Sequence, residues 1–232
     1  MGMIYGPLFI ISIVFAGIGW LLSSKLKSVF AKYSQVGTAS RMSGAQVAQK
    51  MLNDHGLGDV QILQSQGMLS DHYNPQNKTV NLSPDVYNGR SVSAAAVAAH
   101  ECGHAIQHAE AYSMLTLRSK LVPIVSISAK VQQYIFLLGF VAIGSLGTDL
   151  FLMIAIAAFG ITALFAVITL PVEFDASNRA LAWLSTTGST VGMEHEGAKT
   201  TLWWAAMTYV AAALAAVAQL LYLVFYFLGS RD

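Results

Sequence analysis

The sequence predicts a mainly α-helical integral membrane protein with about four transmembrane helices and one water-exposed α+β domain. The first observation is composition: of 232 residues, 55% are hydrophobic and 11% are charged. Soluble domains average about a quarter charged residues, and the mean hydropathy here is +0.55. The second observation is distribution, because only residues 23–130 are polar enough over a sufficient length for a water-exposed domain. The remaining chain therefore predicts membrane helices.

Three apolar runs are strong candidates for membrane spans, namely Ile4–Leu22, Leu150–Val172 and Trp203–Leu228. Ile4–Leu22 lacks a preceding basic segment and a following small-residue cleavage site, so we expect a retained anchor rather than a signal peptide. Val131–Leu146 is a shorter and weaker fourth candidate. Gly147-Thr148-Asp149 predicts a tight turn that would make a helical hairpin of the second and third spans.

The basic residues predict an orientation. With four spans, both termini lie on one side of the membrane. All but one of the 13 lysine and arginine residues then fall on the opposite side, and the exception is Arg231. By the positive-inside rule, residues 23–130 face the cytoplasm. The net charge of +1 is uninformative about nucleic acid, but the sequence has no basic patch with interleaved aromatic residues, so we expect no nucleic-acid partner. One cysteine excludes an internal disulfide.

The polar domain opens with a helical pattern over Ala45–Asn53, which His55-Gly56 is suited to end. Short apolar bursts follow, then the turn signal Asn74–Asn77 and the alternating segment Thr79–Leu82, which is typical of an exposed strand. Together these predict a small β-meander.

The pentapeptide His100-Glu101-Cys102-Gly103-His104 follows the helix-forming run Ser93–Ala99. On a helix, residues four apart share a face, so both imidazoles can bind one ion. Glu101 would lie beside that ion and deprotonate a metal-bound water, as in zinc hydrolases. Cys102 lies about 200° around the helix from His100, which indicates packing, and Gly103 suits the close approach of another helix.

Catalytic zinc usually has three protein ligands. His108 lies about 12 Å along the helix from His100, too far to share its ion, so we expect a polar or supporting role. Glu173 directly follows the third span and Pro171, a residue suited to the entry or kink of a helix. Asp175 competes with Glu173, and two residues apart they point to different helix faces. Position alone leaves the choice open.

Three segments resemble the YugP-type neutral zinc metallopeptidases of bacteria: His100–Gln107, Leu82–Ser91 and Pro171–Ser177. The resemblance covers nearly the whole chain. It implies a multi-pass protein of the bacterial inner membrane with a zincin-like domain. It implies one Zn²⁺ per chain, held by His100, His104 and Glu173, with Glu101 as general base.

The chain is also similar to the HtpX-like membrane proteases, in which the ligand glutamate lies on a later helix. Those enzymes carry aspartate four residues after that glutamate, whereas this sequence has Ser177. Asn178 or Asp175 could instead support the site.

The predicted activity is that of a gluzincin-like metalloendopeptidase acting on a peptide or membrane-protein substrate at the cytoplasmic membrane surface. Tyr87, His195 and Arg179 are candidate donors to the oxyanion, although each also has an ordinary structural interpretation. Val80, Asn81 and Leu82 could offer a strand edge to substrate or merely complete a sheet.

The alternative function is a catalytically silent metal-binding scaffold. A metal transporter is disfavoured because the strong spans lack ionisable residues, and no residue indicates an oligomeric state.

These expectations divide the chain into five parts. Residues 1–22 form an N-terminal transmembrane helix and residues 23–130 the cytoplasmic domain. Residues 131–172 form a transmembrane hairpin, 173–200 a cytoplasmic helix with the third ligand, and 201–232 the last transmembrane helix.

Overall fold

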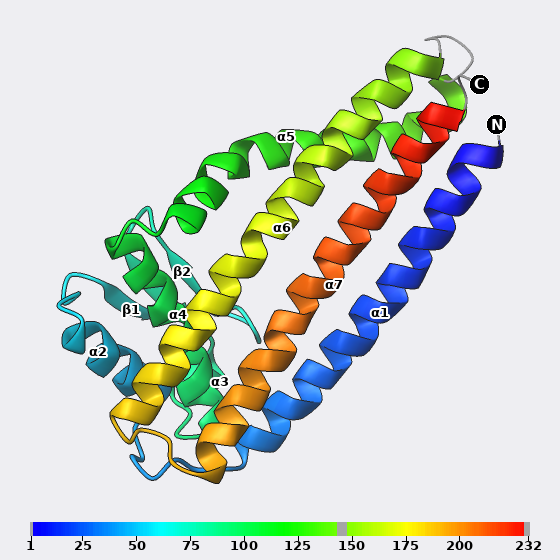
Figure 1. The fold of residues 1–232 in the computed structure, drawn as a ribbon. Coiled ribbons are helices and arrows are strands. Elements are labelled where there is room, and N and C mark those ends of the chain that lie inside the picture. Colours follow the sequence, from blue (N-terminus) through cyan, green and yellow to red (C-terminus); the bar gives the residue numbers. More distant parts are fainter. Residues whose placement is uncertain (1, 143–147, 230–232) are drawn as a thin grey trace. The chain divides into compact units, whose positions relative to one another are not determined.

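The computed structural model describes residues 2–142 and 148–229. Over these residues the chain forms seven helices and three short strands (Figure 1). In chain order the elements are α1 (Gly2–Ser34), α2 (Gly44–Asp54), β1 (Gln61–Gln64), β2 (His72–Asn74), β3 (Thr79–Leu82), α3 (Pro84–Tyr87), α4 (Val92–Ala109), α5 (Ser113–Ala142), α6 (Thr148–Thr186) and α7 (Met193–Gly229).

The elements group into two compact units. We call the first the helical unit, which comprises Met1–Leu21, Leu117–Leu170 and Thr208–Asp232. The second, the mixed unit, comprises Leu22–Thr116 and Pro171–Met207 and contains the sheet. Helices α1, α5, α6 and α7 each contribute residues to both units.

Three helices in the described part of the chain are long and apolar enough to cross a membrane: Gly6–Ser34, Leu150–Thr186 and Met193–Gly229. They coincide with the three strong predicted spans, which are therefore candidate membrane helices, and extend beyond them. The weak fourth candidate, Val131–Leu146, begins within α5, and its last four residues lie outside the described residues. Gly147, the first residue of the turn predicted at Gly147–Asp149, also lies outside them.

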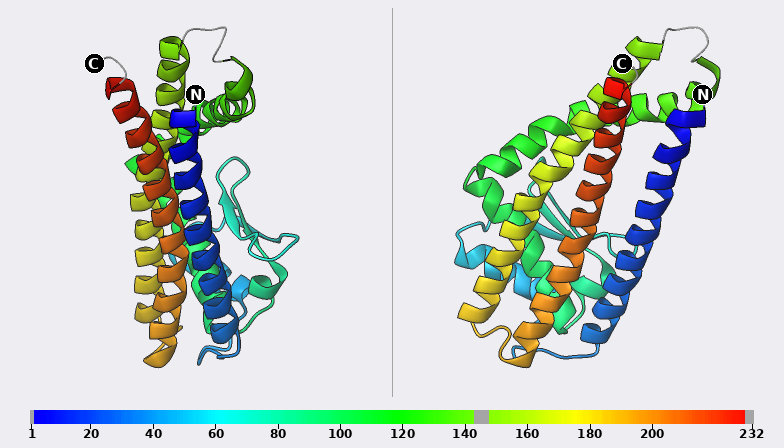
Figure 2. Two further views of the ribbon diagram at one scale, coloured as in Figure 1. Left: turned by 90° about the vertical axis from the view of Figure 1, so that its right-hand side faces the viewer. Right: turned by 45° about the vertical axis from the view of Figure 1, so that its right-hand side comes forward.

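Helix α6 is continuous through Pro171, as its unbroken ribbon in Figure 2 shows. The segment predicted as a cytoplasmic helix over 173–200 is therefore not a helix of its own. The chain instead stays helical to Thr186, and a new helix begins at Met193. Proline at this point removes one backbone donor without ending the helix, so Glu173 lies inside a long helix.

Among the described residues of the helical unit, polar side chains such as Gln132 and Gln219 join neighbouring helices. Gln132 donates from Nε2 to Thr162 Oγ1 at 2.7 Å and to the Ala158 carbonyl at 2.9 Å. Gln219 Nε2 lies 3.0 Å from Ser12 Oγ. Apolar side chains supply the rest of the described packing, with Leu8, Leu152, Ala155 and Leu223 buried together.

In the mixed unit, α2 confirms the predicted helix. Ser43 caps its N-terminus by accepting from the Gln46 backbone N–H, and the Gln46 side chain accepts from the Ser43 N–H in return. This reciprocal capping box satisfies two backbone donors that have no partner inside the helix. His55 is the C-cap, and Gly56 follows with a φ of +70°, which glycine adopts without strain.

The predicted β-meander is wrong in its topology. The strand order is β1-β3-β2, with β1 parallel and β2 antiparallel to β3. The final strand β3 is therefore central, with Thr79, Val80 and Leu82 buried. Because neighbouring strands pair with both of its sides, Val80, Asn81 and Leu82 have no free edge for substrate. The segment from Ser65 to Asp71 instead carries β2 to the far side of β3, leaving β2 as an edge strand.

Helix α4 forms the centre of the mixed unit. Ser91 caps its N-terminus, and most of its residues are buried against α2, α3 and the strands β2 and β3. The small side chains of Ala94, Ala95, Ala96, Ala98 and Ala99 allow this close packing on several faces. The predicted helical context of the His-Glu-x-x-His motif is confirmed.

Candidate metal centre

The two motif histidines of α4 converge on one glutamate of α6. Nε2 of His100 lies 3.3 Å from Glu173 Oε2, and Nε2 of His104 lies 3.6 Å from the same oxygen. One donor atom from each of these three residues can be chosen so that all lie within 4.8 Å of one another. Two imidazole nitrogens and one carboxylate oxygen are a ligand set of catalytic zinc, in which water or substrate takes the remaining position. The donor set therefore fits a zinc ion.

His104 is held by Gln107, one turn later on the same helix. His104 Nδ1 lies 3.0 Å from Gln107 Oε1. Metal-binding histidines usually engage their second ring nitrogen in this way, and the contact fixes the orientation of the ring. The arrangement leaves Nε2 of His104 directed at Glu173.

His100 is held by Ser177 of α6. Ser177 Oγ lies 3.1 Å from His100 Nδ1, so the serine that replaces the aspartate of HtpX-like enzymes itself contacts a predicted ligand. Of the two alternatives, Asn178 is exposed, whereas Asp175 bonds to Gln107. Asp175 thus supports His104 indirectly, and Ser177 supports His100 directly.

Gly103 allows α4 and α6 to approach closely, as its position in the motif predicts. A Cβ atom at this position would lie 2.6 Å from the carbonyl oxygen of Ala176 and 3.1 Å from its Cα. Real Cβ atoms almost never approach backbone atoms this closely. The glycine lies between the two histidines, and Ala176 lies one turn after Glu173. The close contact therefore falls at the metal centre itself.

Glu101 is buried beside the three predicted ligands, with 8% of the residue exposed. Burial raises the pKa of its carboxyl, and the charges of Glu173 and Asp71 raise it further, whereas those of the two histidines lower it. A raised pKa favours the protonated form of the carboxyl, which suits a group that takes up a proton and passes it on. Burial also raises the pKa of Cys102, whose Sγ faces the Ala48 carbonyl and which is inert packing, as predicted.

The three candidate oxyanion donors lie in different surroundings. Arg179 bonds to Asp175 at 2.6 Å and to Glu110 at 2.7 Å, so two carboxylates already engage its guanidinium. His195 lies near the start of α7 with Nδ1 3.2 Å from Thr190 Oγ1. Tyr87 ends α3 and packs against the core of the mixed unit.

His108 lies on α4 beyond the site, where Nδ1 is 2.8 Å from the hydroxyl of Tyr73 in β2. This contact agrees with the expected polar role and links the edge strand to the motif helix.

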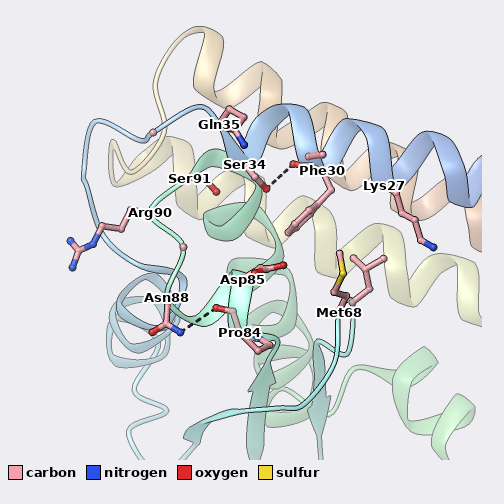
Figure 3. Close-up of a pocket in the computed structure, with 14 residues that line it drawn as sticks. Lys27, Phe30, Ser34, Gln35, Met68, Pro84, Asp85, Asn88, Arg90 and Ser91 are labelled. Carbon is pink, nitrogen blue, oxygen red and sulfur yellow. Dashed lines mark hydrogen bonds between the residues drawn. The ribbon is translucent and has the colours of Figure 1, made fainter.

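A separate groove of about 770 Å³ lies within the mixed unit (Figure 3). It is formed by the end of α1, the loop with Met68 and Leu69, and the segment from Pro84 to Ser91. The three predicted metal ligands and Glu101 are not among its lining residues, so the groove is distinct from the metal centre.

The supporting role of Gln107 was not predicted from the sequence. Its position three residues after His104 was a usable signal, since such residues are neighbours on a helix surface. The 65-residue separation from its partner Val172 carried no such signal.

Comparison with known proteins identifies the family of the chain. The model of a family described as "Putative neutral zinc metallopeptidase" matches residues 8–228, and the chain belongs to this family. The chain is 42% identical over 222 residues to the "Putative membrane protease YugP" of Bacillus subtilis (strain 168), covering 96% of this chain and 97% of the relative. No solved structure matches the chain. Membership supports a zinc-dependent protease, and three apolar helices support a membrane protein.

Proposed function

We propose that the chain is a membrane-anchored, gluzincin-like endopeptidase that holds one Zn²⁺ through His100, His104 and Glu173. The observation that carries this proposal is the convergence of both Nε2 atoms on one Glu173 oxygen, at 3.3 and 3.6 Å. The donors come from helices whose sequence separation is about 70 residues, so the tertiary fold assembles the set. The side chain of His100 is 14% exposed, against 3% for Glu173, which favours approach of substrate from the His100 side.

Zn²⁺, when bound, would polarise the scissile carbonyl and lower the pKa of water. Glu101 accepts a proton from the attacking water and passes it to the leaving amine. Its burial keeps the carboxyl in low-dielectric surroundings, where less of the transferred proton is lost to bulk water. Tyr87, His195 and Arg179 remain the candidates for stabilising the oxyanion.

The substrate is a peptide or a segment of a membrane protein. We place its backbone along the edge of β2, and not along β3 as the sequence suggested. Support comes from the position of β2 at the edge of the sheet and from its packing on α4. An extended peptide could pair with this edge through backbone hydrogen bonds, which would hold it largely independently of its sequence.

We further propose a four-span topology in the bacterial inner membrane, with the metal centre on the cytoplasmic side. The distribution of lysine and arginine supports this orientation, with α5 supplying the second span. An alkaline phosphatase fusion at the C-terminus should be active, because both termini would lie outside. A fluorescent cytoplasmic reporter at that end would instead place the C-terminus in the cytoplasm and contradict the proposed topology.

The decisive test compares the wild-type chain with Glu101→Gln, a variant of nearly identical shape. Zinc content should be unchanged, whereas peptide cleavage should fall by roughly 10²-fold or more, as expected for loss of a general base. His104→Ala provides the matched control, which should lose both zinc and cleavage. Unchanged cleavage in Glu101→Gln would refute the assigned base, and absence of cleavage in wild type with zinc retained would favour the silent scaffold.

A further inference from the structure

The side chain of Gln107 is fully buried on α4, and the proposed reaction does not use it. Its carboxamide makes three hydrogen bonds. The oxygen faces His104 Nδ1 at 3.0 Å, and the nitrogen donates to the Val172 carbonyl and to Asp175 Oδ2, each at 2.8 Å. Burying an amide costs free energy unless its hydrogen bonds are satisfied, so an amide with three buried partners has one preferred orientation.

That orientation follows from the chemistry of the partners. The Val172 carbonyl can only accept hydrogen bonds. Asp175 Oδ2 also accepts, because Arg179 Nε donates to the same oxygen at 2.6 Å. The amide nitrogen of Gln107 must therefore face both groups, and a flipped carboxamide would set its oxygen against two acceptors. Oε1 is left to face His104.

The fixed oxygen in turn selects the tautomer of His104. Nδ1 must carry the proton that it donates to Gln107 Oε1, so the lone pair of the neutral ring lies on Nε2, the atom directed at Glu173. His100 has no equivalent constraint from its partner, since the Ser177 hydroxyl can either donate or accept. The two histidines are therefore held by different means.

The same carboxamide also reaches the helix of the third ligand. Val172 directly precedes Glu173, so the amide nitrogen bonds to the backbone next to that ligand. One side chain thus contacts a ligand of α4 and the backbone of the ligand segment of α6. Arg179 extends the link by bonding to Asp175 and also to Glu110, the C-cap of α4.

We infer that Gln107 is a positioning residue that fixes the tautomer of His104 and the spacing of His104 from Glu173, and so sets the zinc affinity of the site. This inference rests on the proposed zinc site. Partners of metal ligands typically contribute roughly 10- to 100-fold to metal affinity, which sets the size of the expected effect.

The test uses the full chain in detergent, with zinc affinity measured by competition against a chromophoric chelator. Gln107→Met keeps the length and helix propensity of the side chain but removes its hydrogen bonds. We expect the zinc dissociation constant to rise roughly 10- to 100-fold and the visible absorption bands of the Co²⁺-loaded protein to change. Ser93→Ala is the matched control. It removes an equally buried polar group from α4 that bonds to the Phe30 carbonyl, and it should leave both readouts unchanged.

A second variant separates positioning from packing. Gln107→Glu keeps an oxygen that can accept from His104 Nδ1 but cannot donate to Val172, so it should bind zinc more tightly than Gln107→Met. It also provides the comparison with wild type if Gln107→Met does not fold. Equal affinities and Co²⁺ spectra in wild type and Gln107→Met would overturn the inference while leaving the zinc site intact. Equally weak binding in both variants would overturn the role of Gln107 in fixing the His104 tautomer. A wild-type chain that binds no zinc would instead overturn the proposed function.

Discussion

The mixed unit and the helical unit differ in the contacts that stabilise each of them internally. In the mixed unit, a Cβ added to Gly103 would lie 2.6 Å from a backbone oxygen, and Gln107 makes three buried hydrogen bonds. In the helical unit, the Cβ added to Gly160 would meet its nearest neighbour, Leu220 Cδ1, at an ordinary 3.9 Å. Many large apolar side chains there are exposed in the isolated chain, as expected for a surface that faces lipid.

This difference relates packing to function. Under the proposed function, the mixed unit must place donors from α4 and α6 around one ion, and a displacement of about 1 Å would disrupt the geometry of the site. The helical unit has no such requirement among its described residues and can rely on apolar packing with a few polar contacts. The units should therefore respond differently to matched substitutions.

The largest expected difference concerns glycine. Gly103→Ala places a methyl group against the backbone of Ala176, which cannot move without separating α4 from α6. We expect a loss of about 1–3 kcal/mol in the free energy of unfolding and a marked loss of zinc affinity. Thermal unfolding and chelator competition would measure the two effects.

Gly160→Ala is the matched control in the helical unit, since space exists for its methyl group. It should be neutral or should stabilise the helix by up to about 1 kcal/mol. Equal tolerance of alanine at both positions would remove the contrast between the units.

The next effect concerns serine at a helix end. Ser43→Ala removes the acceptor for the Gln46 N–H and breaks the capping box of α2. We expect a loss of about 1 kcal/mol in the free energy of unfolding. Ser126→Ala, in the middle of α5, removes only a bond back to the Val122 carbonyl and should be neutral or slightly stabilising. Chemical denaturation of both variants would show whether the sign of the change depends on position.

The smallest expected effect lies in the helical unit. Gln132→Leu removes the donor to Thr162 and Ala158. Hydrogen bonds between membrane helices contribute about 0.6 kcal/mol on average, so a loss of that order should appear in unfolding by denaturing detergent. A double-mutant cycle with Thr162→Val isolates the pair, and a coupling energy of zero would show that the contact contributes nothing to stability.

The sequence predicted those features whose signals are local. The His-Glu-x-x-His helix, the three strong apolar runs and the helix ended by His55-Gly56 each depend on neighbouring residues, and the structure contains all of them. The order of the strands was mispredicted because strands of three or four residues can pair in several ways, and period alone does not choose among them.

The residues of the candidate site show the same difference between local and long-range signals. The spacing of His100 and His104 was sufficient to predict a shared ion, whereas Glu173 and Asp175 could be separated only by resemblance to known enzymes. The contacts of Ser177 and Gln107 span 77 and 65 residues of sequence. Such contacts depend on the packing of α4 against α6, which no local pattern encodes.

Anomalous scattering at the zinc absorption edge, from crystals of the detergent-solubilised full chain, tests the central claim most directly. The account predicts one peak per chain, about 2.0–2.2 Å from Nε2 of His100, Nε2 of His104 and a carboxylate oxygen of Glu173. A peak bound by Asp175 in place of Glu173, or no peak at the two histidines, would contradict it.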